Sequence, residues 1–204
     1  MRQLTQLRSS FLLLALGLAP TAQAVGIATQ REAVEAELRA RYPKPPEQLD
    51  TDTTKASVLL VAFDLKGALG RVDGAALVRL DNSGGPIRAA RLKGDVVMFH
   101  GLEPGTYSLR FLRVENMNPH ETWVFEKPAT LEITVTVAAG GLSYVGTVVV
   151  NRKIGHVLGN KPPEFQLTYD ARRELEAWSA FRKQYADSPW TVLADRRIAS
   201  LRAS

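Results

Sequence analysis

Residues 99–111 read FHGLEPGTYSLRF and decide what kind of fold the chain can adopt. Pro104 and Gly105 suit the two central positions of a type II turn, because proline fixes a negative φ and glycine supplies a positive one. After the turn, apolar Tyr107 and Leu109 alternate with polar residues, as they do in a strand with one buried face. The stretch therefore predicts a β-hairpin, with Pro104 and Gly105 as its structural turn.

The spacing F-x-G-L-x-P-G-x-Y-x-L over residues 99–109 resembles the hallmark hairpin of carboxypeptidase-regulatory-like domains, which are transthyretin-like β-sandwiches. Residues 140–146, GGLSYVG, resemble the strand entry of bacterial envelope relatives of these domains. The resemblance covers about residues 55–151 and implies a mainly β, antiparallel sandwich. Members of the family are mostly accessory or binding modules, so the resemblance implies a binding role and assigns no catalytic residue.

The rest of the predicted β-domain, residues 55–169, reads as short strands between turns. Residues 57–63 are almost wholly apolar, which is typical of a central strand buried on both faces. Glycines predict turns at 70–74 and 82–86, and strict alternation over 131–137 predicts a strand with one buried face. Short strands separated by turns favour an antiparallel sandwich. Further strands are predicted over residues 75–80, 87–92, 96–100, 123–126, 142–150 and 164–169.

Residues 1–24 have the pattern of a secretory signal peptide. Arg2 and Arg8 precede a short apolar run over 11–19, and an Ala-Gln-Ala cleavage site ends at Ala24. The apolar run is too short to span a bilayer as a helix, although an uncleaved membrane anchor is the alternative. We therefore expect a periplasmic or secreted protein with no transmembrane span after cleavage.

Residues 25–54 are expected to form an N-terminal helix and a Pro-rich linker. Val34, Leu38 and Tyr42 recur every four residues and predict one apolar stripe along a helix over 29–42. Prolines directly after Tyr42 end the helix. Two roles stay open at this stage, packing on the sandwich or binding a partner.

Residues 170–204 predict a C-terminal helical hairpin. Asp170 is placed to cap the first helix, and Ser188 followed by Pro189 is typical of the start of the second. Trp178 and Trp190 lie on apolar stripes, so something must cover them. The sequence leaves open whether the sandwich or a partner does so.

The composition limits the classes of function. The 204 residues are 45% hydrophobic, contain no cysteine and carry a formal net charge of +5. Lack of cysteine excludes disulfides and thiolate chemistry. The basic excess of the mature chain falls within residues 171–204, which is typical of a solvated helix surface, so no nucleic-acid partner is expected.

No motif in the sequence points to catalysis. The pair His120-Glu121 begins like a zinc-protease motif, but Val124 stands where the second histidine ligand belongs. The other two histidines, His100 and His156, are far away in the sequence, and no phosphate-binding loop, nucleophile elbow or dinucleotide fingerprint is present. We expect no metal, no cofactor and no enzyme activity, with an enzyme of unrecognised type as an alternative.

The long connection over residues 115–129 carries the candidate contact residues, because long loops on a rigid sandwich are where binding groups gather. Its candidates for ligand or partner contact are His120, Glu121, Trp123 and Phe125. The leading hypothesis is a non-catalytic exported module that binds or organises another envelope protein. The alternative is a carbohydrate- or cell-wall-binding module that uses this loop.

Overall fold

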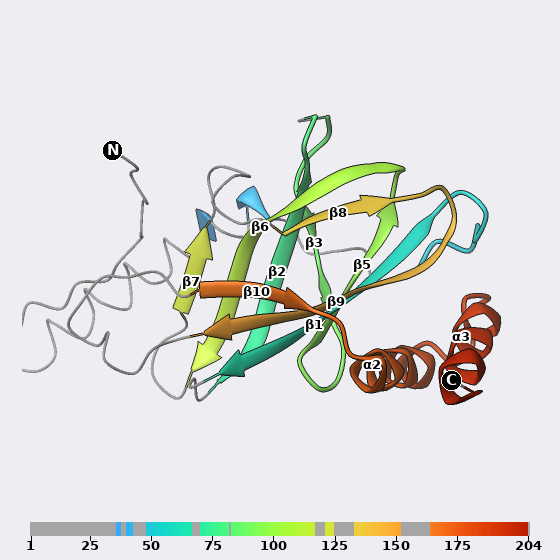
Figure 1. Ribbon diagram of the computed structural model, residues 1–204. Coiled ribbons are helices and arrows are strands. Elements are labelled where there is room, and N and C mark those ends of the chain that lie inside the picture. The colour runs from blue at the N-terminus through green and yellow to red at the C-terminus, as the bar shows by residue number, and fades with distance from the viewer. Residues whose placement is uncertain are drawn as a thin grey trace, which may run out of the picture.

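The computed structural model describes residues 36–37, 40–42, 48–66, 70–81, 83–116, 121–124, 133–151 and 164–203. Within these residues the chain is mainly β, with two five-stranded sheets and two C-terminal helices. Figure 1 shows the sheets stacked one over the other, with both helices on the outer side of one sheet. The predicted signal peptide over 1–24 lies outside the described residues.

Sheet A is built around the strand that the sequence predicts to be central. β1 (Ser57–Lys66) lies between β9 (Gly141–Asn151) and β5 (Val96–Leu102), and is buried along most of its length, as expected. β10 (Glu164–Thr168) and β4 (Ala90–Arg91) form the two edges. The prediction of a wholly antiparallel sandwich is wrong, because β1 and β9 pair in parallel. Both strands start at the same end of the sheet, where the Ser57 hydroxyl donates to the Ala138 carbonyl oxygen at 2.7 Å.

Sheet B has β6 at its centre. β6 (Gly105–Asn116) pairs with β2 (Gly70–Arg79) on one side, and β3 (Ile87–Arg88) lies beyond β2. On the other side β7 (Glu121–Val124) and β8 (Thr134–Val137) follow one another along the same edge of β6.

Two turn and strand predictions are corrected here. The turn predicted at 70–74 is part of β2, because the cross-strand partners on β6 hold this Gly-rich stretch extended. The strand predicted over 87–92 divides into β3 and β4, which lie in different sheets. The Ala89 amide between them donates to the Ala75 carbonyl oxygen at 2.8 Å, so this short stretch links the two sheets.

The predicted hairpin around Pro104 is wrong. β5 belongs to sheet A, where it lies between β1 and β4, whereas β6 belongs to sheet B. Both strands have their partners elsewhere, so residues 103–104 form a corner that crosses between the sheets. Gly105 begins β6 with a nearly extended φ of 159°, not the value near +80° of a type II turn, and Gly101 has a left-handed φ of 66° instead. The Tyr107 hydroxyl donates to the Glu103 carbonyl oxygen at 2.8 Å and ties the corner down.

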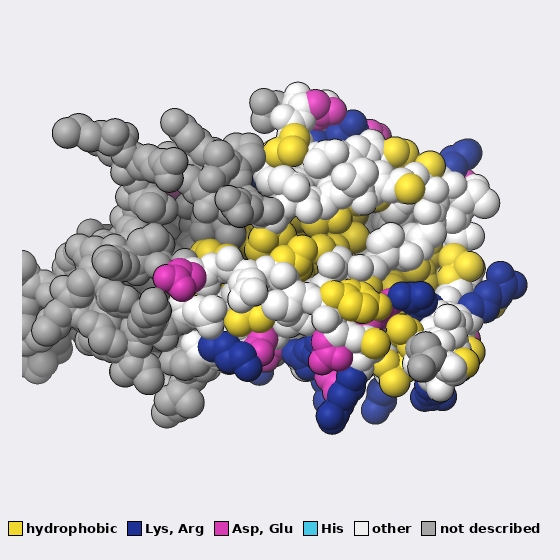
Figure 2. Space-filling model, viewed as in Figure 1, with side chains coloured by type: hydrophobic (Ala, Val, Ile, Leu, Met, Phe, Trp, Pro, Cys, Tyr) yellow, Lys and Arg dark blue, Asp and Glu magenta, His cyan; other side chains and the backbone are white. Residues whose placement is uncertain are grey.

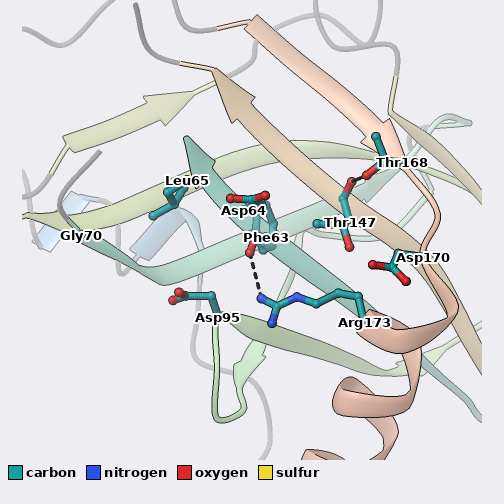
Figure 3. A pocket seen from close by; sticks show the side chains of 9 residues that line it. All are labelled: Phe63, Asp64, Leu65, Gly70, Asp95, Thr147, Thr168, Asp170 and Arg173. Atoms are coloured by element: carbon teal, nitrogen blue, oxygen red, sulfur yellow. Dashed lines mark hydrogen bonds between the residues drawn. The ribbon is translucent and has the colours of Figure 1, made fainter. Parts of the chain in front are cut away.

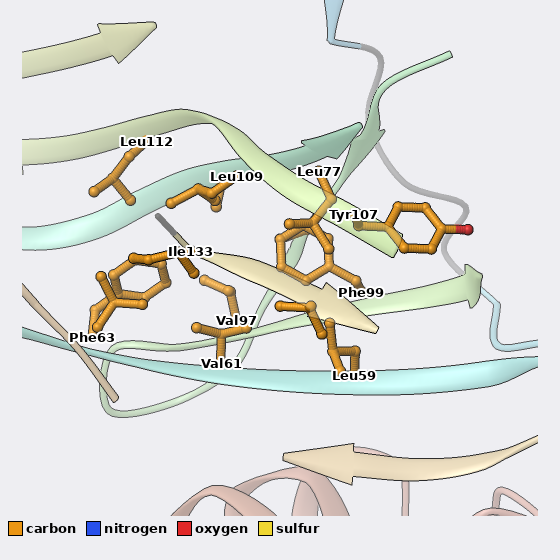
Figure 4. Close-up of a cluster of buried hydrophobic side chains, with 14 of the residues drawn as sticks. Leu59, Val61, Phe63, Leu77, Val97, Phe99, Tyr107, Leu109, Leu112 and Ile133 are labelled. Carbon is orange, nitrogen blue, oxygen red and sulfur yellow. The ribbon is translucent and has the colours of Figure 1, made fainter. Parts of the chain in front are cut away.

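The main core lies between the two sheets (Figure 4). Tyr107 and Leu109 point into it from β6, as their alternation predicts, and meet Leu59 and Phe63 of β1 across the sandwich. Buried apolar area of this kind stabilises the folded state by roughly 25 cal/mol per Å². The stretch over 99–111 therefore has the predicted buried face, although its two strands do not pair.

A second apolar layer joins sheet A to helices α2 (Ala171–Gln184) and α3 (Thr191–Ala203). Trp178 and Trp190 are fully buried against the outer face of β1, where Leu60 is among their neighbours in the cluster. This answers the open question about the hairpin, since the sandwich itself covers both tryptophans. The Trp190 indole also donates to the Asp50 carbonyl oxygen at 2.6 Å, which ties the linker before β1 to the helices.

The helix starts follow the capping rules in part. The Asp170 side chain accepts from the Arg172 amide and caps α2, as predicted. α3 begins at Thr191, later than the predicted start, although the Ser188 hydroxyl still accepts from the Trp190 amide at 3.3 Å. Within the part of the chain described here, no helix is long and apolar enough to cross a membrane.

The N-terminal helix predicted over 29–42 is described only in fragments. Residues 36–37 and 40–41 have helical backbone, and Tyr42 follows with 3% of its surface exposed. The other residues of this range lie outside the described part of the chain, so the helix as a whole stays a prediction.

Candidate functional site

The structure describes two of the four predicted contact residues, Glu121 and Trp123. His120 and Phe125 lie outside the described residues. Glu121 and Trp123 fall in β7, where their backbones pair with Val114 and Leu112 of β6. The connection after β6 is therefore partly a strand, close to where an edge strand was predicted. The proposed contact role of these four side chains stays a prediction.

Glu174 on α2, which sequence reasoning missed, accepts hydrogen bonds from three other side chains. Only 2% of its surface is exposed. Arg197 of α3 donates to both carboxylate oxygens, at 2.7 and 3.0 Å, and the Trp178 indole donates at 3.0 Å. The Tyr169 hydroxyl donates as well. The spacing of Glu174 and Trp178, four residues apart on one helix face, was the available signal.

The charge state of Glu174 follows from this environment. Burial favours the neutral acid, but the hydrogen bonds from Arg197, Tyr169 and Trp178 outweigh it and lower the pKa of the carboxyl. An ionised carboxylate with this many donors is not available as a general acid near neutral pH. Glu174 is therefore a structural clamp that joins α2, α3 and the end of β10.

A cavity of about 510 Å³ lies between sheet A and the N-terminus of α2. Figure 3 shows that its walls come from the end of β1, the start of β2, the middle of β9, the end of β10, the loop before β5 and the N-terminus of α2. It is partly open to solvent. Its lining residues are Phe63, Asp64, Leu65, Gly70, Asp95, Thr147, Thr168, Asp170 and Arg173.

The one arginine in this cavity has a structural task. One guanidinium nitrogen of Arg173 donates to the carbonyl oxygens of Phe63, at 3.2 Å, and Gly94, at 3.0 Å. Another pairs with Glu176 at 3.0 Å. Arg173 therefore fastens α2 to the end of β1 and to the loop before β5, and is not poised toward a ligand.

The carboxylates of the cavity also have partners within the fold. Asp95 accepts from the Val72 amide at 3.2 Å, and Asp64 pairs with Lys66 at 2.8 Å. Asp170 is occupied as the cap of α2. Nowhere in the described ranges do three or more His, Cys, Asp or Glu side chains gather so that they could hold a metal ion. The cavity is best explained as the junction at which the helix meets the sandwich.

A groove runs along one side of the sandwich (Figure 2). Figure 2 shows hydrophobic side chains at its floor, between the strands of sheet B above and those of sheet A below. The strands that border it are β8 on one side and β9 with β10 on the other (Figure 1). Val145 of β9 and Phe165 of β10 are only partly buried where they pack against the main core. We call this feature the edge groove.

The edge of β8 on this groove carries backbone groups that pair with no strand in the part of the chain that the structure describes. The Leu109 amide donates to the Ile133 carbonyl oxygen, and alternate residues of an antiparallel strand point their backbone groups the same way. The backbone groups of Val135 and Val137 therefore face β6. Those of Thr134 and Thr136 face the groove and have no strand partner among the described residues.

The facing edge of β9 is open over half its length. β10 pairs only with residues 147–151 of β9, so residues 141–145 have β1 as their one strand partner in the described part of the chain. The register with β1 shifts at Val145, and Gly146 follows with a φ of 133°. A Cβ on Gly146 would lie 2.5 Å from the Thr168 carbonyl oxygen, so only glycine lets the end of β10 pass this closely.

Comparison with known proteins adds little. A scan of protein families finds no match, and no curated protein is similar. Among solved structures, a proposed cell adhesion protein from Bacteroides fragilis has 12% identity and a TM-score of 0.32. The matched region covers 58% of this chain and 47% of that protein, so the chain spans about half of its length. A score this low does not establish a shared fold, and the function has to be argued from the molecule.

Proposed function

We propose that this chain is a non-catalytic, exported transthyretin-like module that binds another protein of the cell envelope. The observation that carries the proposal is the edge groove, where an apolar floor lies between two strand edges that have no strand partner among the described residues. An extended segment of a partner is the ligand that matches both features, because it supplies backbone hydrogen bonds and alternating side chains together.

The chemistry of strand addition fits β8. The amides and carbonyls of Thr134 and Thr136 would pair with the added strand, each hydrogen bond contributing about 0.5 to 1.5 kcal/mol net. The threonine side chains point outward and are exposed, so they leave the groove to the partner's side chains. Every second side chain of the added strand would then face Val145 and Phe165.

The polar groups described above favour binding over catalysis. The hydrogen-bonding groups of three of these side chains are engaged within the fold. Glu174 joins α2 to α3, Arg173 fastens α2 to the sandwich, and Asp170 caps α2. The edge groove offers backbone groups and apolar side chains, which recognise a chain rather than transform it.

A single-cysteine cross-linking experiment tests the proposal, because the chain has no cysteine of its own. Thr136→Cys places one thiol on the outer face of β8, directly beside the strand edge that borders the groove, where a photoreactive maleimide label can reach a strand added at that edge. The control is Arg172→Cys on α2, whose side chain is 86% exposed. Both labelled proteins are illuminated in periplasmic extract.

We expect a discrete protein adduct from Thr136→Cys and none from Arg172→Cys. Adding Thr134→Pro should abolish the adduct, because proline removes an amide that faces the groove and costs no hydrogen bond to β6. Equal adducts from both positions, or an adduct that survives Thr134→Pro, would contradict binding at this edge. An adduct competed by soluble cell-wall sugars would favour the carbohydrate alternative.

A further inference from the structure

The strands that border the edge groove are almost free of charge. Charged residues make up 23% of the chain, but β8, β9 and β10 contain a single one, Glu164 at the first position of β10. β8 reads TVTV, so it lacks the charges and prolines with which edge strands usually prevent pairing with another chain. An edge of this kind is suited to receive a strand, and an uncharged segment complements it best.

Leu167 is the large apolar side chain that these three strands leave exposed. Its cross-strand partner on β9 is Val148, which belongs to the main core, so both side chains lie on the core-facing side of sheet A. Val148 is 0% exposed, whereas Leu167 is 40% exposed. Leu167 therefore offers apolar surface at the groove that a bound segment would cover.

Two further apolar side chains lie beside Leu167. Phe165, two residues earlier on β10, points to the same side and is only partly buried against the main core. Val145 of β9 is also partly buried there. An added Cβ on Gly146 would lie 3.1 Å from a methyl carbon of Leu167, so glycine at this position leaves room for Leu167 against β9.

Phe165 and Leu167 have the spacing of alternate side chains on an extended strand. Such side chains are roughly 6 to 7 Å apart and point the same way. Two alternate side chains of a segment added beside β8 can therefore each contact one of them. A charged side chain at either position would lose hydration against this apolar surface and find no opposite charge on the three strands that face it, apart from Glu164 at the far end of β10.

We propose that the edge groove selects an uncharged partner segment with large apolar side chains at two alternate positions, and that Leu167 sets this preference. The inference rests on the proposed function, because it requires a strand added beside β8. A segment with the alternation covers Leu167 and Phe165 together. A segment without it would place a polar side chain over one of them.

A library of random nonapeptides displayed on phage tests the inference. It is selected against the purified protein and against three variants, Thr134→Pro, Leu167→Ser and Val192→Ser. Thr134→Pro reports on strand addition itself, whereas Leu167→Ser reports on the side-chain preference. Val192 lies on α3 and is 56% exposed, so Val192→Ser removes an exposed apolar side chain outside the groove and serves as the matched control.

We expect enriched peptides to carry apolar residues at two alternate positions and no charge at either. The Kd of the most enriched peptide, measured by fluorescence polarisation, should rise at least about tenfold with Leu167→Ser and change by less than about twofold with Val192→Ser. A retained melting transition shows that each variant is folded. If Leu167→Ser does not retain it, Leu167→Thr takes its place.

The possible failures can be told apart. A lack of peptides enriched over the Thr134→Pro variant would contradict strand addition, and with it both the proposed function and this inference. Peptides that depend on Thr134 but lack the alternation, or that bind Leu167→Ser unchanged, would leave strand addition in place and overturn the preference. A dimer of the purified protein that Thr134→Pro dissociates would show that a second copy occupies the edge, which overturns an outside partner.

Discussion

At the scale of single residues, Glu174 is the side chain through which α2, α3 and the end of β10 are joined by hydrogen bonds. Its carboxylate receives donors from α2, from α3 and from the residue after β10, so three elements depend on one side chain. A buried carboxylate of this kind stabilises the fold only while its hydrogen-bond donors remain. Removing the carboxylate lowers the free energy of unfolding by more than the interaction itself contributes, because the donors are left without an acceptor.

Glu174→Gln should therefore lower the free energy of unfolding by about 1 to 3 kcal/mol. The amide keeps the shape of the side chain but turns one acceptor into a donor that faces Arg197. The charge part of the loss is modest, because 46% of the Arg197 side chain is exposed. Urea unfolding measures the change, and Glu176→Gln, whose exposed carboxylate pairs only on the surface of α2, should shift the free energy by less than about 0.5 kcal/mol. Equal losses would contradict the clamp.

The pH dependence of stability has a defined sign. The pKa of Glu174 is lower in the folded chain than in the unfolded one, so the unfolded state binds the extra proton as the pH falls. The stabilisation from this group is complete above its unfolded pKa, about 4.3, and is lost below it as the folded pKa is approached. Urea midpoints measured from pH 6 to pH 3 should fall more steeply for the parent than for Glu174→Gln. Parallel curves for the two proteins would show that a different carboxylate determines the pH dependence of stability in this range.

Two glycines differ in what an added Cβ would meet, backbone at Gly146 and a flexible side chain at Gly105. Gly146→Ala should destabilise the chain by about 2 to 3 kcal/mol, because the new Cβ meets a backbone oxygen and the φ of 133° is strained for alanine. Gly105→Ala should cost less, about 1 to 2 kcal/mol, because its φ of 159° is also strained for alanine but its Cβ would lie 3.1 Å from the flexible end of Arg79 instead of against backbone. Thermal melts of the two variants give the order, and a larger loss at Gly105 would contradict it.

At the scale of elements, the sequence predicts features that depend on a pattern within one segment. It does not predict which distant strands pair with one another. The two apolar faces of β1, the alternation in β6 and the stripes of α2 and α3 could all be predicted, because each is a period within one segment. The parallel pairing of β1 with β9 and the corner at Pro104 could not. Strong turn residues are compatible with a hairpin and with a crossing between sheets, and only the other strands decide between them.

The packing of the helices on β1 gives the prediction at this scale. Trp178→Ala should lower the free energy of unfolding by about 3 to 5 kcal/mol, because it leaves a cavity between α2 and sheet A. Val192→Ala on α3 is the matched control, since Val192 is 56% exposed, and should change stability by less than about 0.5 kcal/mol. Denaturant midpoints followed by far-UV circular dichroism would check both. A small effect of Trp178→Ala would mean that the helices are not part of the cooperative fold.

At the scale of the whole molecule, the candidate site could be predicted less well than the fold. Sequence reasoning looked for a binding site among side chains of the 115–129 connection. The edge groove, which that reasoning did not reach, is made from backbone groups of Thr134 and Thr136 and from the half of β9 that does not pair with β10. Backbone groups carry no residue signature, so an open strand edge is visible only once the partners of every strand are known.

The parallel pairing of β1 with β9 also limits how early in its synthesis the chain can fold. β1 is among the first strands to leave the ribosome, yet its partners β5 and β9 and the helices that cover its outer face all lie downstream. Contacts of such long sequence separation are slow to form. A chain still being synthesised would therefore leave the apolar outer face of β1 uncovered until Trp190 has been made.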